Sequence, residues 1–352
     1  MMETIQIGSR PVGPGHSVYI VAEISANHGQ KFEQAVEIIH AARKAGADAV
    51  KLQTYTPDTM TIRGDSDLLR INGGTLWDGR TLHELYSEAY MPWEWQPKLK
   101  QVANEAGLEL FSSPFDGSAV DFLERMEVTA YKIASFEIVD LPLIKRIAQT
   151  GKPLIISTGM ATFEEIQEAL TTARGAGATQ IALLKCTSAY PAPADEMNLR
   201  TLPELARRFQ VPVGLSDHMI GITAPIAAVA LGASIIEKHI TLSRSIKGPD
   251  SEFSLEPQEF RQMVEAVRST ERALGKVQFG PGVNESKCRI FRRSLFVVED
   301  LKQGQVFDEG NVRSIRPAHG LHTRHLGEVL GKHASRDIEG GTPLSWDLVA
   351  NK

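Results

Sequence analysis

A complete strand–helix–strand unit is encoded by residues 19–54, YIVAEISANHGQKFEQAVEIIHAARKAGADAVKLQT. The β-rich runs Tyr19–Ser25 and Ala49–Thr54 form its two ends. Between them, small and apolar residues recur at helical spacing and share one face; they are Ala35, Ile38, Ile39 and Ala42. An Ala-Gly-Ala sequence at 45–47 is typical of the end of such a helix. The stretch therefore predicts two strands joined by an amphipathic helix.

The same alternation continues to about residue 275 and predicts eight strands. An α/β protein with eight such units closes its parallel strands into a TIM barrel, (β/α)8. The alternative, an open doubly wound sheet, calls for a glycine-rich turn after the first strand, where this chain has Ala26-Asn27-His28-Gly29. We therefore predict the barrel, with strands at Tyr19–Ser25, Ala49–Thr54, Glu109–Ser113, Ala130–Ser135, Leu154–Thr158, Ile181–Thr187, Val213–Ser216 and Ser234–Ile240.

The pattern changes after Leu274-Gly275. We expect a barrel domain over residues 1–275, a linker over 276–288, and a small C-terminal domain over 289–352 with short strands such as Ser294–Val298 and Leu301–Val306. A long segment from Thr56 to Trp95, with three tryptophans, interrupts the barrel rhythm. Loops of this length are usually functional or disordered, and the tryptophans favour a wall of a substrate site.

Composition limits the classes of function. Of the 352 residues, 42% are hydrophobic and 23% are charged, which fits a globular protein. A net charge of −5 gives no sign of a nucleic-acid partner. Two cysteines cannot form a disulfide framework and fit a reducing compartment. The first residues lack a signal pattern, and the nearly uncharged stretch Ile220–Ile236 is too short to cross a membrane. We expect a soluble cytoplasmic protein.

Polar side chains alternate with apolar ones along several predicted strands. Because the outer face of a barrel strand meets apolar helices, the polar set is expected inside; it comprises Glu23, Lys51, Gln53, Lys132, Lys185, Glu237 and His239. Lysines beside the strand-end hydroxyls of Ser113, Ser135, Ser157 and Thr187 suit a phosphate or carboxylate ligand. A self-neutralising structural network is the alternative. Lys238 breaks the alternation without an evident reason.

His218 and His239 end neighbouring predicted strands. Two imidazoles there can share a divalent ion and leave positions open for substrate and water, although this pair does not distinguish Mn²⁺, Mg²⁺, Fe²⁺ and Zn²⁺. Two independent, hydrogen-bonded histidines are the alternative reading of the spacing.

Taken together and in order, eight motifs resemble those of the sialic acid synthase family. The C-terminal residues, through Arg316-Pro317 and Gly331-Lys332, resemble the family's antifreeze-like (SAF) domain. Residues 76–80, 93–95 and 316–322 look closest to its pseudaminic acid synthase branch. The eight motifs are VAEISANHG (21–29), KLQTY (51–55), SSPF (112–115), YKIAS (131–135), STGM (157–160), KCTSAYP (185–191), GLSDH (214–218) and EKH (237–239).

The resemblance implies an enzyme that condenses phosphoenolpyruvate with an acylamino sugar to a nine-carbon 2-keto acid and releases phosphate. For the pseudaminic branch the sugar is 2,4-diacetamido-2,4,6-trideoxy-L-altrose; N-acetylneuraminate or legionaminate synthesis is the alternative within the family. The resemblance also implies a divalent metal cofactor, Mn²⁺ or Mg²⁺, on His218 and His239, where it would act as a Lewis acid.

The same resemblance assigns roles to individual residues. Phosphoenolpyruvate would be held by Lys51, Lys132, Ser113, Ser135 and Ser157, with Thr187 or Ser188 adding contacts. The catalytic carboxylates would be Glu23 and Glu137, and the sugar-contacting residues Gln53, Tyr190 and Asp250. Arg316 would reach the active site of the other subunit in a domain-swapped homodimer.

Two rival functions remain open from the residues alone. One is a Schiff-base aldolase with Lys132 or Lys185 as the amine nucleophile. The other is a non-catalytic carbohydrate-binding protein that uses its C-terminal domain.

Overall fold

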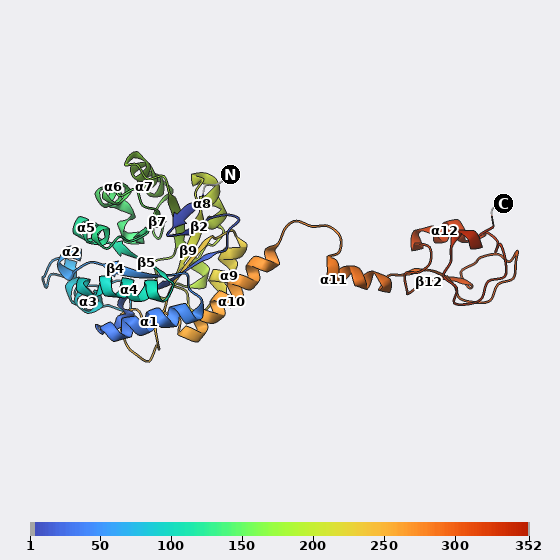
Figure 1. Ribbon diagram of the computed structural model, residues 1–352, viewed down its shortest axis with the longest axis horizontal. Helices are drawn as coiled ribbons and strands as arrows, with labels where there is room; N and C mark the ends of the chain where they lie inside the picture. Colours follow the sequence, from blue (N-terminus) through green and yellow to red (C-terminus); the bar gives the residue numbers. More distant parts are fainter. Residues whose placement is uncertain (1–3, 351–352) are drawn as a thin grey trace. The chain divides into compact units, whose positions relative to one another are not determined.

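The computed structural model describes residues 4–350, so the outermost residues of the two predicted domains, 1–3 and 351–352, lie outside the described part of the chain. The chain divides into two compact units between Gly275 and Lys276. The first unit is an α/β barrel, and the second is a small unit of short strands and single-turn helices (Figure 1).

Eight parallel strands close into a barrel because β10 pairs with both β9 and β3. The prediction of a (β/α)8 barrel is confirmed. Most strands end within one or two residues of the predicted positions; the residues beyond β3 and β6 enter the 3-10 helices η1 (Ser25–His28) and η4 (Ser135–Val139) instead. The strands are β3 (Tyr19–Glu23), β4 (Ala49–Thr54), β5 (Glu109–Pro114), β6 (Tyr131–Ile133), β7 (Leu154–Ser157), β8 (Ile181–Cys186), β9 (Val213–Asp217) and β10 (Ile235–His239).

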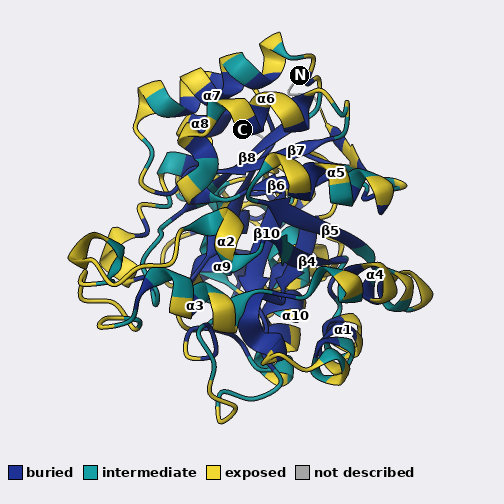
Figure 2. Ribbon diagram, turned by 90° about the vertical axis from the view of Figure 1, so that its left-hand side faces the viewer, coloured by how far each residue is buried: buried dark blue, intermediate teal, exposed yellow. Residues whose placement is uncertain are grey.

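A layer of helices covers the strands, with buried faces turned inward and exposed faces outward (Figure 2). In α1 the buried residues include the predicted apolar stripe, and the helix is capped by Gly46, whose φ of 93° favours glycine. The principal helices are α1 (Phe32–Ala45), α4 (Gln96–Glu105), α5 (Gly117–Arg125), α6 (Leu141–Ala148), α7 (Phe163–Gly175), α8 (Thr201–Phe209), α9 (Thr223–Ala230) and α10 (Pro257–Leu274).

The long segment between β4 and α4 is folded. It contains α2 (Pro57–Met60), η2 (Asp67–Leu69), α3 (Leu82–Ala89) and η3 (Trp93–Trp95). Its indole groups tie it to the barrel: Trp93 Nε1 donates to the Tyr55 carbonyl at 3.0 Å, and Trp77 Nε1 donates to the Pro249 carbonyl at 3.0 Å. The segment is therefore anchored at the end of the barrel where strands β4 and β10 finish.

A hairpin that was not predicted from the sequence closes the opposite end of the barrel. Its antiparallel strands are β1 (Ile5–Ile7) and β2 (Arg10–Val12). Three buried side chains of the hairpin join a cluster of apolar residues from the barrel strands, which fills the lower part of the barrel. The pore is therefore filled at its N-terminal end, and the site must open at the C-terminal end.

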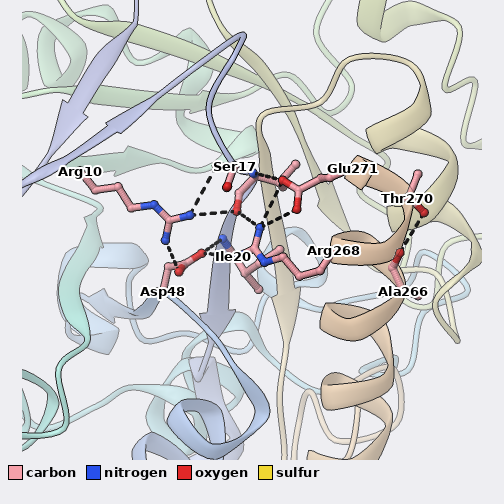
Figure 3. Close-up of polar contacts among 9 residues, drawn as sticks. Arg10, Ser17, Ile20, Asp48, Ala266, Arg268, Thr270 and Glu271 are labelled. Atoms are coloured by element: carbon pink, nitrogen blue, oxygen red, sulfur yellow. Dashed lines mark hydrogen bonds and ion pairs between the residues drawn. The ribbon is translucent and has the colours of Figure 1, made fainter. Parts of the chain in front are cut away.

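Ion pairs reinforce this closed end (Figure 3). Asp48, just before β4, accepts from the Ile20 backbone N–H at 2.8 Å and from Arg268 of α10 at 3.2 Å, and it also pairs with Arg10 of β2. Arg268 donates in addition to the Val18 carbonyl at 2.8 Å. The hairpin, two strand starts and the last barrel helix are thereby joined.

The second unit has a core of its own, built on a two-stranded sheet. The predicted strand at 301–306 is wrong: Leu301 and Val306 form only isolated bridges, because a turn with Gly304 at φ 81° lies between them. The elements are α11 (Val283–Ser286), η6 (Lys287–Phe291), β11 (Ser294–Val297), β12 (Val312–Ile315), η7 (Thr323–His325), α12 (Leu326–Val329) and η8 (Trp346–Leu348). Within residues 4–350, none of the helices combines the length and apolar character needed to cross a bilayer.

Candidate active site

Nearly all of the predicted site residues lie at the C-terminal ends of the barrel strands or in the loops that follow them. Such strand ends are where barrel enzymes carry their catalytic groups. Nine of these residues are buried: Glu23, Lys51, Ser113, Lys132, Ser135, Ser157, His218, His239 and Asp250. Five are half-buried: Gln53, Glu137, Thr187, Ser188 and Tyr190.

A charged cluster spans β3, β4 and β10. Lys51 Nζ lies 2.8 Å from Glu23 Oε2 and 3.8 Å from Glu237 Oε1, and it donates to Ser113 Oγ at 3.4 Å. Gln53 Nε2 donates to the second oxygen of Glu23 at 3.0 Å. Burial raises the pKa of Glu23, although the neighbouring ammonium of Lys51 opposes that shift. The cluster fixes the Glu23 carboxylate in one orientation.

A second cluster, across β6, β7 and β8, is cationic. Lys132 Nζ donates to Ser157 Oγ at 2.6 Å and to the Ile133 carbonyl at 2.9 Å. Lys185 Nζ donates to the Cys186 carbonyl at 2.7 Å and to Thr187 Oγ1 at 3.2 Å. No carboxylate within residues 4–350 forms an ion pair with either ammonium. Burial lowers the pKa of both lysines, and an anionic ligand would restore the charged form.

Glycine at position 159 lets the chain pass close to this cluster. Its backbone N–H donates to Ser135 Oγ at 3.2 Å. A side-chain Cβ at this position would stand 2.7 Å from that same oxygen and would also clash with Ser188 Oγ. Both predicted hydroxyls therefore lie against Gly159, next to the tip of β7.

The two predicted metal ligands face each other at the ends of β9 and β10. The ring centroids of His218 and His239 are 5.2 Å apart. His218 Nδ1 is within 3.1 Å of the Thr187 carbonyl, which leaves Nε2 free as a ligand atom. His239 Nδ1 is buried and has no hydrogen-bond partner in the described part of the chain. The pair fits a shared divalent ion.

Protein groups alone would not complete such a coordination sphere. Among residues 4–350, the histidine, cysteine and carboxylate side chains form no group of three or more that could hold a metal ion. The two imidazoles would therefore leave the other coordination positions to water and substrate.

Aromatic rings form a wall beside the imidazoles. Tyr190 lies over His218 with ring centroids 4.4 Å apart, and it contacts Phe253 at 5.2 Å and Trp77 at 5.4 Å. Trp77 belongs to the long segment between β4 and α4, so this segment contributes to the wall, as the tryptophans indicated. Buried Asp250 lies nearby, where it accepts hydrogen bonds from Ser25 Oγ and, at 3.3 Å, from the Ala26 N–H.

Glu137 forms no ion pair within residues 4–350, unlike Glu23 and Glu237. Its Oε2 is buried without a hydrogen-bond partner in the described chain. Burial raises the pKa of Glu137 to about 7. This carboxyl group can therefore exchange a proton near neutral pH.

Because its pKa is raised on folding, Glu137 makes the stability of the protein depend on pH. Between its ordinary pKa of 4.5 and about 7, the folded state binds a proton that the unfolded state has released, so stability falls as pH rises. Relative to wild type, the Glu137→Gln variant should gain about 2 kcal/mol in free energy of unfolding between pH 5 and pH 8. Urea unfolding at both pH values measures this difference, with the exposed Glu127→Gln as control; equal changes in both variants would contradict it.

The structure also adds residues to the predicted site. Glu237 accepts from Ser216 Oγ at 2.8 Å and pairs with Lys51. Strand alternation predicted that Glu237 and Lys185 point into the barrel, and both contact residues of the site. The family resemblance had assigned no role to either residue. Arg316 is exposed and directly follows β12 in the second unit. Its participation in an active site stays a prediction.

The closed barrel, its lysine- and hydroxyl-rich strand ends, and the small second domain define a (β/α)8-barrel enzyme with a C-terminal SAF domain, the latter matched at residues 292–350. The chain belongs to the NeuB family, whose model matches residues 38–279. The resemblance to the sialic acid synthase family is thereby confirmed.

Curated and solved relatives agree with this assignment. The chain is 48% identical to a pseudaminic acid synthase of Campylobacter jejuni, over 93% of this chain and 95% of that protein. It is 46% identical to a pseudaminic acid synthase of Helicobacter pylori, over 94% of this chain and 97% of that protein. A crystal structure of N-acetylneuraminic acid synthetase from Leptospira borgpetersenii, in complex with citrate, matches with a TM-score of 0.73 and 30% identity over 82% of this chain and 95% of the other.

Proposed function

We propose that the protein makes pseudaminic acid. It condenses phosphoenolpyruvate with 2,4-diacetamido-2,4,6-trideoxy-L-altrose to a nine-carbon 2-keto sugar acid and releases phosphate. The observation that carries the proposal is the pair of lysines, Lys132 and Lys185, that have hydroxyl partners but no carboxylate partner among the described residues. Identity of 46–48% to pseudaminic acid synthases, against 30% to the N-acetylneuraminic acid synthetase, favours this sugar.

In this proposal the cationic cluster binds the substrate anion. Lys132 and Lys185, with Ser157 and Thr187, bind the phosphate and carboxylate of phosphoenolpyruvate. Its C3 attacks the aldehyde carbon of the sugar, whose oxygen takes up a proton and becomes a hydroxyl, and C2 becomes electron-poor. Water then adds to C2 with loss of a proton. Cleavage of the bond between C2 and the phosphate oxygen releases phosphate, and loss of the hydroxyl proton leaves the 2-keto group.

The carboxylates act on the second half of this reaction. Glu23, fixed by Lys51 and Gln53, stabilises the positive charge that develops at C2. Glu137, with a pKa of about 7, is suited to accept the proton of the attacking water. His218 and His239 would hold Mn²⁺ or Mg²⁺, whose chemistry when bound is polarisation of the aldehyde carbonyl.

A substrate panel tests the proposal. The purified chain is assayed with phosphoenolpyruvate and several amino sugars, and phosphate release is followed. Turnover of the diacetamido altrose sugar is expected; turnover of N-acetylmannosamine alone would transfer the proposal to N-acetylneuraminate synthesis. A borohydride-trapped lysine adduct and activity in EDTA would favour the aldolase. Binding of sugars without any turnover would favour the carbohydrate-binding alternative.

Trp77 is expected to contribute to recognition of the sugar, whose acetamido and C6 methyl groups suit an aromatic surface. Trp77→Ala should raise the KM for the sugar about tenfold, the loss expected for one aromatic contact. The KM for phosphoenolpyruvate should stay within about twofold, because the lysine cluster lies on β6 and β8 and not in the segment that carries Trp77. Steady-state kinetics with each substrate varied tests this, with Trp77→Phe as the conservative control; an equal rise in both KM values would contradict the assignment.

We further propose a domain-swapped homodimer in which Arg316 reaches the partner's barrel. Arg316→Ala alone should impair use of the sugar. When it is mixed and re-equilibrated with a Lys132→Met variant, about one quarter of the sites should be intact, because half of the dimers are mixed and each has one complete site. Phosphate release by the mixture measures this recovery. If none occurs, Arg316 does not act on the partner subunit.

A cytoplasmic location belongs to the same proposal. Phosphoenolpyruvate is a cytoplasmic metabolite, and both cysteines, Cys186 and Cys288, are free thiols.

A further inference from the structure

Lys238 and Asp217 form an ion pair on the outer side of the barrel, between the strands and the helices. Lys238 Nζ lies 2.6 Å from Asp217 Oδ2, and neither side chain is exposed to solvent. The neighbouring outward side chains are apolar and belong to the main core: Leu215 on β9, Ile236 on β10 and Ile240 directly after β10. The lysine that breaks the alternation in the sequence therefore has its partner on the adjacent strand.

Net stability does not account for an ion pair at this position. Removing two charges from water costs several kcal/mol per ion, and apolar replacement of a buried pair is often neutral or stabilising. Apolar side chains occupy this layer between strands and helices two positions before Asp217 and two positions before and after Lys238. A role other than stabilisation is therefore needed to explain it.

The pair stands directly beside the two predicted metal ligands in the chain. Lys238 and Asp217 are partners in the register of β10 and β9, and each is followed by one of the histidines. Asp217 Oδ1 also accepts from the Met219 N–H at 2.9 Å, and Lys238 Nζ donates to the Met219 carbonyl. These contacts join the chain on both sides of His218 to the residue before His239.

We infer that the Lys238–Asp217 pair positions the two imidazoles and thereby sets the metal affinity of the site. The two rings are held 5.2 Å apart at an interplanar angle of 58°. His218 has a ring contact to the Thr187 carbonyl, whereas Nδ1 of His239 has no partner among the described residues. Packing against Phe253, with ring centroids 5.0 Å apart, and the backbone that the pair anchors therefore orient His239. The inference rests on the metal binding proposed above.

Direct measurement of Mn²⁺ binding tests the inference without any turnover. Both charges are removed together in Asp217→Leu/Lys238→Met, so that no unpaired charge is left buried. After chelator treatment, Mn²⁺ is titrated and followed by calorimetry or by the electron paramagnetic resonance signal of free Mn²⁺. The Kd should rise about 10- to 100-fold, the usual effect of groups that orient metal ligands. The affinity for phosphoenolpyruvate without metal should stay within about twofold.

Two further double variants complete the test. Asp217→Asn/Lys238→Met retains an acceptor for the Met219 N–H and should also bind Mn²⁺ more weakly. Arg261→Met/Glu265→Leu removes an exposed pair on α10, joined at 2.8 Å, and should bind Mn²⁺ as the wild type does. Circular dichroism and thermal unfolding establish that each variant is folded.

The outcomes separate this inference from the proposed metal site. If the wild type binds no Mn²⁺, or His218→Ala binds it equally well, the metal site is wrong and the inference fails with it. If wild-type binding depends on His218 but the first double variant has wild-type affinity, only the inference is overturned. Loss of folding in both Asp217/Lys238 double variants would assign the pair to stability and would also overturn it.

Discussion

Replacing Lys132 with methionine should lower kcat/KM for phosphoenolpyruvate about 10³-fold while the barrel stays folded. The ammonium of Lys132 is buried at the end of β6, and its partners are the Ser157 hydroxyl and a backbone carbonyl. No carboxylate forms an ion pair with it within residues 4–350, and the nearby buried Glu237 keeps its ion pair with Lys51 after the substitution. The loss therefore falls on binding of the anionic substrate rather than on stability.

Phosphate-release kinetics and calorimetric titration with phosphoenolpyruvate measure this effect. The matched control is Lys100→Met on α4, where the lysine also contacts backbone carbonyls, Met126 at 2.6 Å among them, but on the outside of the barrel. The control should keep wild-type kinetics. Wild-type affinity for phosphoenolpyruvate in Lys132→Met would refute the binding role of the cationic cluster and remove the main support of the proposed function.

The barrel could be predicted because its signals are local. Each strand is a short run of buried residues, and each helix has an apolar stripe that depends only on its own residues. The N-terminal hairpin was missed because β1 and β2 have three residues each and one contains Pro11. Such short runs form strands only because the barrel interior buries their side chains. The residues that line this interior are distant in the sequence, so a local pattern does not reveal them.

The site residues that could be predicted are those that strand alternation or the family resemblance indicates. Alternation placed Lys185 and Glu237 inside the barrel, although the resemblance assigned them no role. It offered no explanation of Lys238, because the compensating charge of Asp217 comes from register with another strand. The wall contact between Trp77 and Tyr190 likewise joins segments more than a hundred residues apart. Register and long-range contacts of this kind cannot be obtained from one sequence.

Replacing His218 with alanine is expected to abolish turnover in a way that added metal cannot restore. The wild type should lose activity in EDTA and regain it with Mn²⁺ or Mg²⁺, whereas His218→Ala should stay about 10³-fold or more below wild type, or about 4 kcal/mol in transition-state stabilisation. The reason is geometric: His239 alone would supply one protein ligand, and among residues 4–350 no cluster of three or more such side chains offers a replacement.

The design of this experiment separates metal chemistry from packing. His218 also lies against Tyr190 and Phe253, so its loss alone can disturb the aromatic wall. His218→Gln preserves more of that packing and should be as inactive as the alanine variant, while His40→Ala, on the exposed side of α1, should retain wild-type activity and metal response. Turnover by His218→Ala that equals wild type at trace metal would refute the metal assignment. Because the lysine cluster lies on β6 and β8, binding of phosphoenolpyruvate should survive in both His218 variants, and this retained binding would assign the defect to activation of the sugar.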